Sequence, residues 1–133
     1  MKAMKYEYRF KVRLHDVDHA GVMFFARLFV HAHDAYKDFM AGKGMAIGDM
    51  IADGARLPIV HASADYLLPL RHGESIDVVL EVGQPGQTSF TVNYVFRCGD
   101  ELRARLQTVH VFVAAQTGLP ASLPQAILQQ LLS

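Results

Sequence analysis

The first part of the chain alternates between apolar and charged residues with a period of two. Five apolar side chains are each separated by one charged residue: Tyr6, Tyr8, Phe10, Val12 and Leu14. Such alternation is typical of a strand with one buried face, and it predicts a strand over residues 6–14. The pattern then changes to the helical period over residues 24–41. Seven residues form its apolar stripe: Leu28, Phe29, Ala32, Ala35, Tyr36, Phe39 and Met40. The width of this stripe predicts a long helix that is buried over much of its circumference.

From residue 57 onward the chain is predicted to be mainly β-structure. Apolar and alternating runs predict strands over 59–68, 75–82, 90–96 and 102–114, with turns at 84–87 and 98–101. Short helices are expected at 47–52 and 124–132. Within 102–114 the apolar phase changes between Leu106 and Val109, which predicts a β-bulge near Gln107 or Thr108.

This order of elements is a strand, a long helix and four strands joined by short turns. It favours the α+β class, with an antiparallel sheet of about five strands wrapped around one long central helix. The chain has 133 residues, of which 51% are hydrophobic. That length and apolar content predict a single domain over residues 1–133.

Composition narrows the classes of partner. The 13 basic and 13 acidic side chains cancel, so bulk charge does not favour a nucleic acid or a membrane surface. No run of 18 apolar residues occurs, and the alternating first ten residues lack the apolar core of a signal peptide, so we expect a cytoplasmic protein. The single cysteine, Cys98, excludes an intrachain disulfide framework. His31 and His33 point roughly 200° apart on a helix, so we expect no metal site and no cofactor.

The segment between the first strand and the long helix holds the candidate chemistry. It contains two carboxylates, Asp16 and Asp18, followed by Gly21. A carboxylate at the start of a helix lies beside backbone N–H groups that have no helical acceptor. Asp18 could serve there as a nucleophile or base next to an oxyanion site, or it could simply cap the helix.

Five ordered segments of the chain carry a resemblance to a known family. They are Asp16-x-Asp18-x-Ala20-Gly21-Val22, His33-Asp34-Ala35-Tyr36, Pro58-Ile59-Val60-His61-Ala62, Pro69-Leu70-x-x-Gly73-Glu74 and Val109-His110-Val111. With them the chain resembles, over nearly its whole length, the hotdog-fold acyl-CoA thioesterases of the 4-hydroxybenzoyl-CoA thioesterase family. Within that family it is most similar to the 1,4-dihydroxy-2-naphthoyl-CoA thioesterases.

The resemblance implies that the protein hydrolyses an aromatic acyl-CoA to the free acid and CoA. Asp18 matches the residue that attacks the thioester carbonyl or activates water, and the N–H of Phe25 matches the oxyanion donor. Asp16 is more compatible with a role in holding the loop. Gly21 provides either close approach of the substrate or a backbone turn with positive φ.

Further residues are expected to bind the substrate. His33, fifteen positions after Asp18, matches the position from which the family reaches a ring substituent across the subunit interface, or it is bonded within that interface. His61 and Ser63 are expected on the strand that flanks the pocket from the partner subunit. For CoA, the basic turn Arg71-His72-Gly73 is the main candidate, and Arg103 and Arg105 are further possible phosphate contacts.

The resemblance also implies an assembly, namely a homodimer with two sites at its interface that pairs into a homotetramer. Two alternative functions use the same fold. An enoyl-CoA hydratase needs an aspartate and a histidine five residues apart, but Met23 follows Asp18 at that distance and Gly21 follows Asp16. A non-catalytic acyl-CoA-binding protein remains the second reading.

Overall fold

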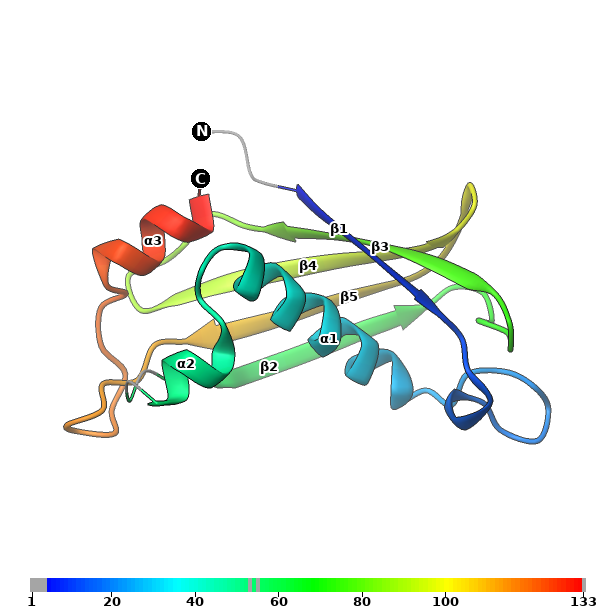
Figure 1. Cartoon of the computed structure of the whole chain (residues 1–133), viewed down its shortest axis with the longest axis horizontal. Coiled ribbons are helices and arrows are strands. Elements are labelled where there is room, and N and C mark those ends of the chain that lie inside the picture. Colours follow the sequence, from blue (N-terminus) through cyan, green and yellow to red (C-terminus); the bar gives the residue numbers. More distant parts are fainter. Residues whose placement is uncertain (1–4, 53, 55, 133) are drawn as a thin grey trace.

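The computed structural model describes residues 5–52, 54 and 56–132. In chain order, the elements are β1 (Lys5–Lys11), a 3-10 helix (Leu14–Asp16), α1 (Arg27–Gly42), α2 (Ile47–Ala52), β2 (Ile59–Tyr66), β3 (Ser75–Val82), β4 (Ser89–Cys98), β5 (Glu101–Val111) and α3 (Gln125–Leu132). The five strands form one antiparallel sheet in the order β1-β3-β4-β5-β2, and α1 packs across one face of it (Figure 1). The predicted α+β arrangement is confirmed.

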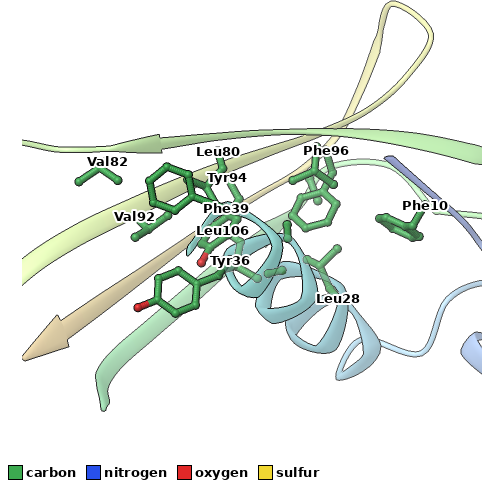
Figure 2. Packing of buried hydrophobic residues seen from close by; sticks show 14 of the residues in the cluster. Phe10, Leu28, Tyr36, Phe39, Leu80, Val82, Val92, Tyr94, Phe96 and Leu106 are labelled. Carbon is green, nitrogen blue, oxygen red and sulfur yellow. The ribbon is translucent and has the colours of Figure 1, made fainter. Parts of the chain in front are cut away.

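The core lies between α1 and the sheet, and the period-two alternation of the strands creates it. The inward residues of β3 and β4 are all buried: Ile76, Val78, Leu80, Val82, Phe90, Val92, Tyr94 and Phe96. They meet the apolar stripe of α1, whose Tyr36 and Phe39 lie against the sheet in Figure 2. All of the predicted stripe is buried except Phe29, which is half-buried at the edge of the core.

Several predicted boundaries differ from the structure; among them, β5 ends at Val111, three residues before the predicted end. β1 ends at Lys11, and Leu14 lies in the 3-10 helix with 74% of its surface exposed, so the expected inward position of Leu14 is wrong. α1 begins at Arg27 rather than at residue 24, because the N–H of Phe24 donates to the carbonyl of Asp16 and keeps that residue in the loop. β2 ends at Tyr66, two residues before the predicted end.

The bulge in β5 also lies elsewhere than predicted. Thr108 is buried and its alternation continues without interruption, so a bulge near Gln107 or Thr108 is wrong. The extra residue is Arg103, because Phe96 pairs with Ala104 while Arg97 pairs with Leu102. This bulge allows Arg103 and Ala104, which are neighbours in sequence, both to be buried.

The fold brings two connections to the same end of the sheet. The loop between β1 and α1 and the connection from β2 to β3 both lie on the right in Figure 1. Arg71, in the second connection, forms an isolated antiparallel bridge with Val22 in the first. Among the described residues, no helix is long and apolar enough to span a membrane.

Candidate active site

Residues 17–23 form a narrow loop that carries Asp18. Val17 and Met23 are paired at its neck, and the N–H of Asp18 donates to the carbonyl of Val22 at 3.0 Å. Gly21 has a φ of +77°, and a Cβ there would meet nothing within 4 Å. Of the two predicted reasons for a glycine at this position, the structure therefore supports the positive φ.

Asp18 is exposed on this loop and has few restraints. Its Oδ1 accepts the N–H of Ala20 at 2.8 Å, and its carbonyl accepts the N–H of Gly21 at 3.0 Å. Both bonds are local to the turn and orient the carboxylate without covering it. The side chain is thus held in place while remaining open to a ligand and to water.

Asp16, only two residues earlier, is fully buried. Its Oδ2 accepts the N–H of Arg13 and its Oδ1 accepts the Nε–H of Arg27, each at 2.9 Å. The Nε2 of His31 lies 2.9 Å from the same Oδ1, at ion-pair distance but not aligned for a hydrogen bond. Burial alone raises the pKa of Asp16, but the N–H groups of Arg13 and Arg27 and the adjacent His31 outweigh it and hold the pKa below its ordinary value.

The backbone before α1 leaves a donor unused. The carbonyl of Phe24 accepts the N–H of Arg27 at 2.9 Å, so it points into the first turn of the helix. Since the C=O and N–H of a trans peptide point in opposite directions, the N–H of Phe25 points away from the helix, toward the loop that precedes it. Within the part of the chain that the structure describes, this N–H has no backbone acceptor.

An apolar pocket of about 350 Å³ adjoins this donor. Its lining residues come from the loop and from the end of β2: Val22, Met23, Phe25, Tyr66, Leu67, Leu68, Pro69 and Leu70. The hydroxyl of Tyr66 donates to the carbonyl of Phe25 at 2.5 Å, which fixes the peptide at the start of α1 against the pocket wall. A planar, apolar group suits such a lining.

The predicted CoA-binding turn lies beside the same loop. The N–H of His72 donates to the carbonyl of Gly21 at 3.1 Å, and Arg71 forms the bridge with Val22 described above. Gly73 has a φ of +87° and donates its N–H to the carbonyl of Val12. The side chains of Arg71 and His72 are exposed. The structure thus brings Asp18, Gly21, Phe25 and this turn together at one end of the sheet.

The other predicted substrate residues lie elsewhere in the protomer. His33 is exposed on α1, with its ring 5.9 Å from that of Tyr36. Desolvation and the nearby Lys37 lower the pKa of His33. His61 and Ser63 pair with Val109 and Gln107, whose side chains lie on the face of the sheet opposite α1. The protomer alone therefore does not bring His61 or Ser63 to the pocket.

Some residues around the site have a different role from the predicted one, or had none predicted. Arg103 was expected as a possible phosphate contact, but it is buried and paired with Glu74, so that expectation is wrong. Arg27 and His31 surround Asp16, and Tyr66 binds Phe25. Of these residues, only Glu74 stood in one of the five matching segments. The sequence signal that could have indicated its ion pair is Arg103, a charged residue between the apolar Leu102 and Ala104 of a strand.

Comparison with known proteins identifies the family. The Thioesterase-like superfamily matches residues 12–131 of the chain. The chain belongs to this superfamily. A 1,4-dihydroxy-2-naphthoyl-CoA hydrolase of Synechococcus elongatus is 32% identical over 124 residues, which cover 92% of this chain and 91% of that protein. One from Rippkaea orientalis is 32% identical over 131 residues, covering 96% and 95%.

A solved structure supports the same conclusion for this member of the thioesterase-like superfamily. The crystal structure of a 1,4-dihydroxy-2-naphthoyl-CoA thioesterase from Synechocystis matches with a TM-score of 0.90 and 30% identity, covering 96% of each chain. The predicted hotdog fold, the thioester hydrolase activity and the resemblance to the 1,4-dihydroxy-2-naphthoyl-CoA thioesterases are thereby confirmed.

Proposed function

We propose that this thioesterase hydrolyses an aromatic acyl-CoA at the loop that precedes α1, with Asp18 as nucleophile or general base and the N–H of Phe25 as oxyanion donor. The observation that carries the proposal is the N–H of Phe25, which has no backbone acceptor in the described chain and belongs to a residue that lines an apolar pocket beside the loop of Asp18. An electrophilic carbonyl placed between them meets a carboxylate on one side and a hydrogen-bond donor on the other.

The chemistry needs only these groups and water. In one route, an oxygen of Asp18 attacks the thioester carbon, the C–S bond breaks, CoA leaves as the thiolate, and water then hydrolyses the mixed anhydride. In the other, Asp18 takes a proton from a water molecule that attacks the same carbon. In both, negative charge develops on the carbonyl oxygen and the N–H of Phe25 stabilises it. Such a donor typically contributes about 2.7–4 kcal/mol.

The acyl group is proposed to be aromatic. The pocket wall is apolar, and the relatives described above are named for the 1,4-dihydroxy-2-naphthoyl thioester. Depression of the pKa of His33 favours the neutral imidazole, which can both donate and accept a hydrogen bond. We therefore keep His33 as the residue that meets a ring hydroxyl of the acyl group bound at the partner subunit's loop.

For the CoA portion, we propose the turn Arg71-His72-Gly73. It is bonded to Gly21 and Val22, so a pantetheine arm leaving the pocket passes beside it. Arg71 is the exposed cation of this turn and suits a phosphate. A contact of His61 or Ser63 with substrate stays a prediction, as does a cytoplasmic location.

A homodimer through β2 is proposed because the two edges of the sheet differ. The outward residues of β1 are charged, as is common for an edge that avoids pairing: Lys5, Glu7, Arg9 and Lys11. In contrast, every residue of β2 except Ala64 is exposed, and Ile59 and Val60 are 43% and 60% exposed. Antiparallel pairing of two β2 strands would cover these side chains and place α1 of each subunit beside the other. The homotetramer stays a prediction.

The test is release of CoA thiol from a panel of esters by the purified wild type, with Asp18→Asn as the matched blank. The panel contains 1,4-dihydroxy-2-naphthoyl-, 4-hydroxybenzoyl-, benzoyl- and hexanoyl-CoA. We expect the aromatic esters to give the highest kcat/KM and Asp18→Asn to be inactive on all of them. Equal release by both proteins would exclude the catalytic role of Asp18.

The non-catalytic reading makes a different prediction for the same panel. A binding protein would release no thiol from any ester while still binding them in calorimetry. An enoyl-CoA hydratase is disfavoured by the structure around Met23, the residue five positions after Asp18. Met23 is only 8% exposed and its N–H is bonded to the carbonyl of Leu70, so it offers no acid or base.

A further inference from the structure

Arg103 is a buried arginine for which the proposed chemistry has no use. It is 8% exposed and lies at the bulge of β5. Its Nη1 and Nη2 donate to the two carboxylate oxygens of Glu74 at 2.8 and 2.7 Å, and its Nε donates to Glu101 at 2.6 Å. This bidentate geometry is specific to arginine. The pairing holds the pKa of Glu74 at about 2, so the pair stays charged across the ordinary pH range.

The same residue also holds the wall of the pocket through its backbone. The carbonyl of Arg103 accepts the N–H groups of both Leu67 and Leu68, at 2.9 and 3.0 Å. Its Nη1 donates to the carbonyl of Pro69 at 2.6 Å. One residue thus binds three consecutive residues of the wall. Leu67 and Leu68 are 45% and 44% exposed, so apolar burial contributes little to their position in the protomer.

The wall in turn holds the loop of Asp18. Glu74 accepts the N–H of Arg71 at 2.6 Å. One residue earlier, the carbonyl of Leu70 accepts the N–H of Met23 at 2.7 Å. A continuous set of hydrogen bonds therefore runs from the bulge of β5, through the pocket wall, to the neck of the loop.

We propose that Arg103 and Glu74 are a positioning pair that fixes the pocket wall against the loop of Asp18, and so sets the selectivity of the enzyme for a bulky, planar acyl group. This inference rests on the proposed function. We expect a bulky planar group to fill the pocket of about 350 Å³ between wall and loop, and an acetyl group to leave most of it empty. Loosening the wall therefore affects the aromatic ester and leaves the small ester nearly unchanged.

The test separates positioning from stability. A buried ion pair can often be replaced by apolar residues of similar size with little loss of stability. The double variant Arg103→Met/Glu74→Leu is therefore expected to unfold within about 5 °C of the wild type. Its ratio of kcat/KM for 1,4-dihydroxy-2-naphthoyl-CoA to that for acetyl-CoA should fall about tenfold, a change of about 1.4 kcal/mol. Arg103→Lys, which keeps the charge but not the bidentate geometry, should show a smaller fall in the same ratio.

A second readout does not depend on activity. Hydrogen exchange of the Met23 amide, which is bonded to the wall, should accelerate about tenfold in the double variant. The amide of Leu80, inside β3, is the internal reference and should not change. The double variant Arg9→Met/Asp77→Leu, which removes an exposed arginine–carboxylate pair between β1 and β3, is the matched control and should change neither readout.

The outcomes are distinguishable. If the double variant unfolds like the wild type and keeps both the selectivity ratio and the protection of Met23, the positioning role is excluded. If the double variant does not fold, the same two measurements are made on Arg103→Lys: an unchanged selectivity ratio and unchanged exchange of the Met23 amide would exclude the positioning role. If the wild type cleaves no ester, the proposed function fails, and exchange at Met23 still tests whether the pair holds the loop.

Discussion

Asp16 and Asp18 lie two residues apart in the connection between β1 and α1, yet their surroundings are opposite. Asp16, at the base, is fully buried against Arg27 and His31. Asp18, beyond the neck, is exposed and bonded only within its own turn. We propose that the buried carboxylate holds the backbone and that the exposed one, Asp18, meets the substrate, because a carboxylate that must reach a substrate cannot also be covered.

Asp16 also anchors the backbone that carries the proposed oxyanion donor, the N–H of Phe25. The carbonyl of Asp16 accepts the N–H of Phe24, and the next N–H, that of Phe25, has no backbone acceptor in the described chain. Asp16 therefore holds the strand end, α1 and the donor peptide in one arrangement. Variants of the two carboxylates should consequently separate, one losing stability and the other losing chemistry.

The largest expected loss of stability is that of Asp16→Asn. Removing this charge leaves Arg27 and His31 without their shared partner in a buried setting, which costs about 3 kcal/mol. Urea unfolding of wild type and variant measures the difference. Asp34→Asn, which removes an exposed pair with Lys37 on the same helix, is the control and should cost about 0.5 kcal/mol or less. Equal midpoints for Asp16→Asn and wild type would contradict the role of the base.

His110 is a second buried titratable residue, but unlike Asp16 its surroundings favour the neutral form. His110 stacks between Tyr36 and Phe90, and burial lowers its pKa from 6.5 to about 4. Its Nδ1 lies 3.3 Å from the carbonyl of Leu57, and its Nε2 lies 2.9 Å from the hydroxyl of Thr108. This geometry suits the neutral ring, with Nδ1 as donor and Nε2 as acceptor.

The sign of the pH effect follows from this lowered pKa. Between pH 6.5 and 4 the unfolded chain binds a proton at His110 that the folded chain does not, so stability falls as the pH falls. The loss attributable to His110 is about 3 kcal/mol across that window. His110→Phe is expected to be less stable at pH 7 but to have a shallower decline, as measured by urea unfolding at several pH values. If the free energy of unfolding of the variant and that of the wild type fall in parallel with pH, His110 does not contribute to the pH dependence.

The elements of the fold that could be predicted from the sequence are those with a regular spacing of apolar residues. The alternation of β3 and β4 and the stripe of α1 each follow from which residues must leave water, so those elements were predicted correctly. The predicted bulge was wrong because the inward positions after Leu106 are occupied by the polar residues Thr108 and His110, whereas the apolar Val109 and Val111 lie on the other face. The real irregularity is made by Arg103, whose burial depends on an ion pair with a residue 29 positions away.

The site was predicted in part for the same reason. Asp18 and Gly21 belong to a local motif, and a motif is visible in sequence. The side-chain partners of Asp16 come from the first residue of α1 and from one turn further along it, and Tyr66 reaches Phe25 from the end of another strand. Such contacts depend on how the helix start meets the sheet, which no local pattern encodes.

The smallest expected effect concerns the turn at the tip. Gly21→Ala introduces a Cβ at a φ of +77° where space is open, so the cost is backbone strain alone, about 1–2 kcal/mol. Gly48→Ala is the matched control, because Gly48 is helical with open space around it and should gain roughly 0.5–1 kcal/mol. Urea unfolding of the two variants measures both changes in the free energy of unfolding. An unchanged stability of Gly21→Ala would mean that the turn tolerates a side chain.

The most direct test of the division between base and tip is the rate of thioester cleavage by Asp18→Asn and Asp16→Asn, each corrected for its folded fraction. With saturating 1,4-dihydroxy-2-naphthoyl-CoA, we predict that Asp18→Asn is fully folded and slower than the wild type by about 10³-fold or more. Asp16→Asn, once corrected, should retain a larger share of the wild-type rate. A fully folded Asp18→Asn that cleaves the ester within tenfold of the wild-type rate would contradict the account.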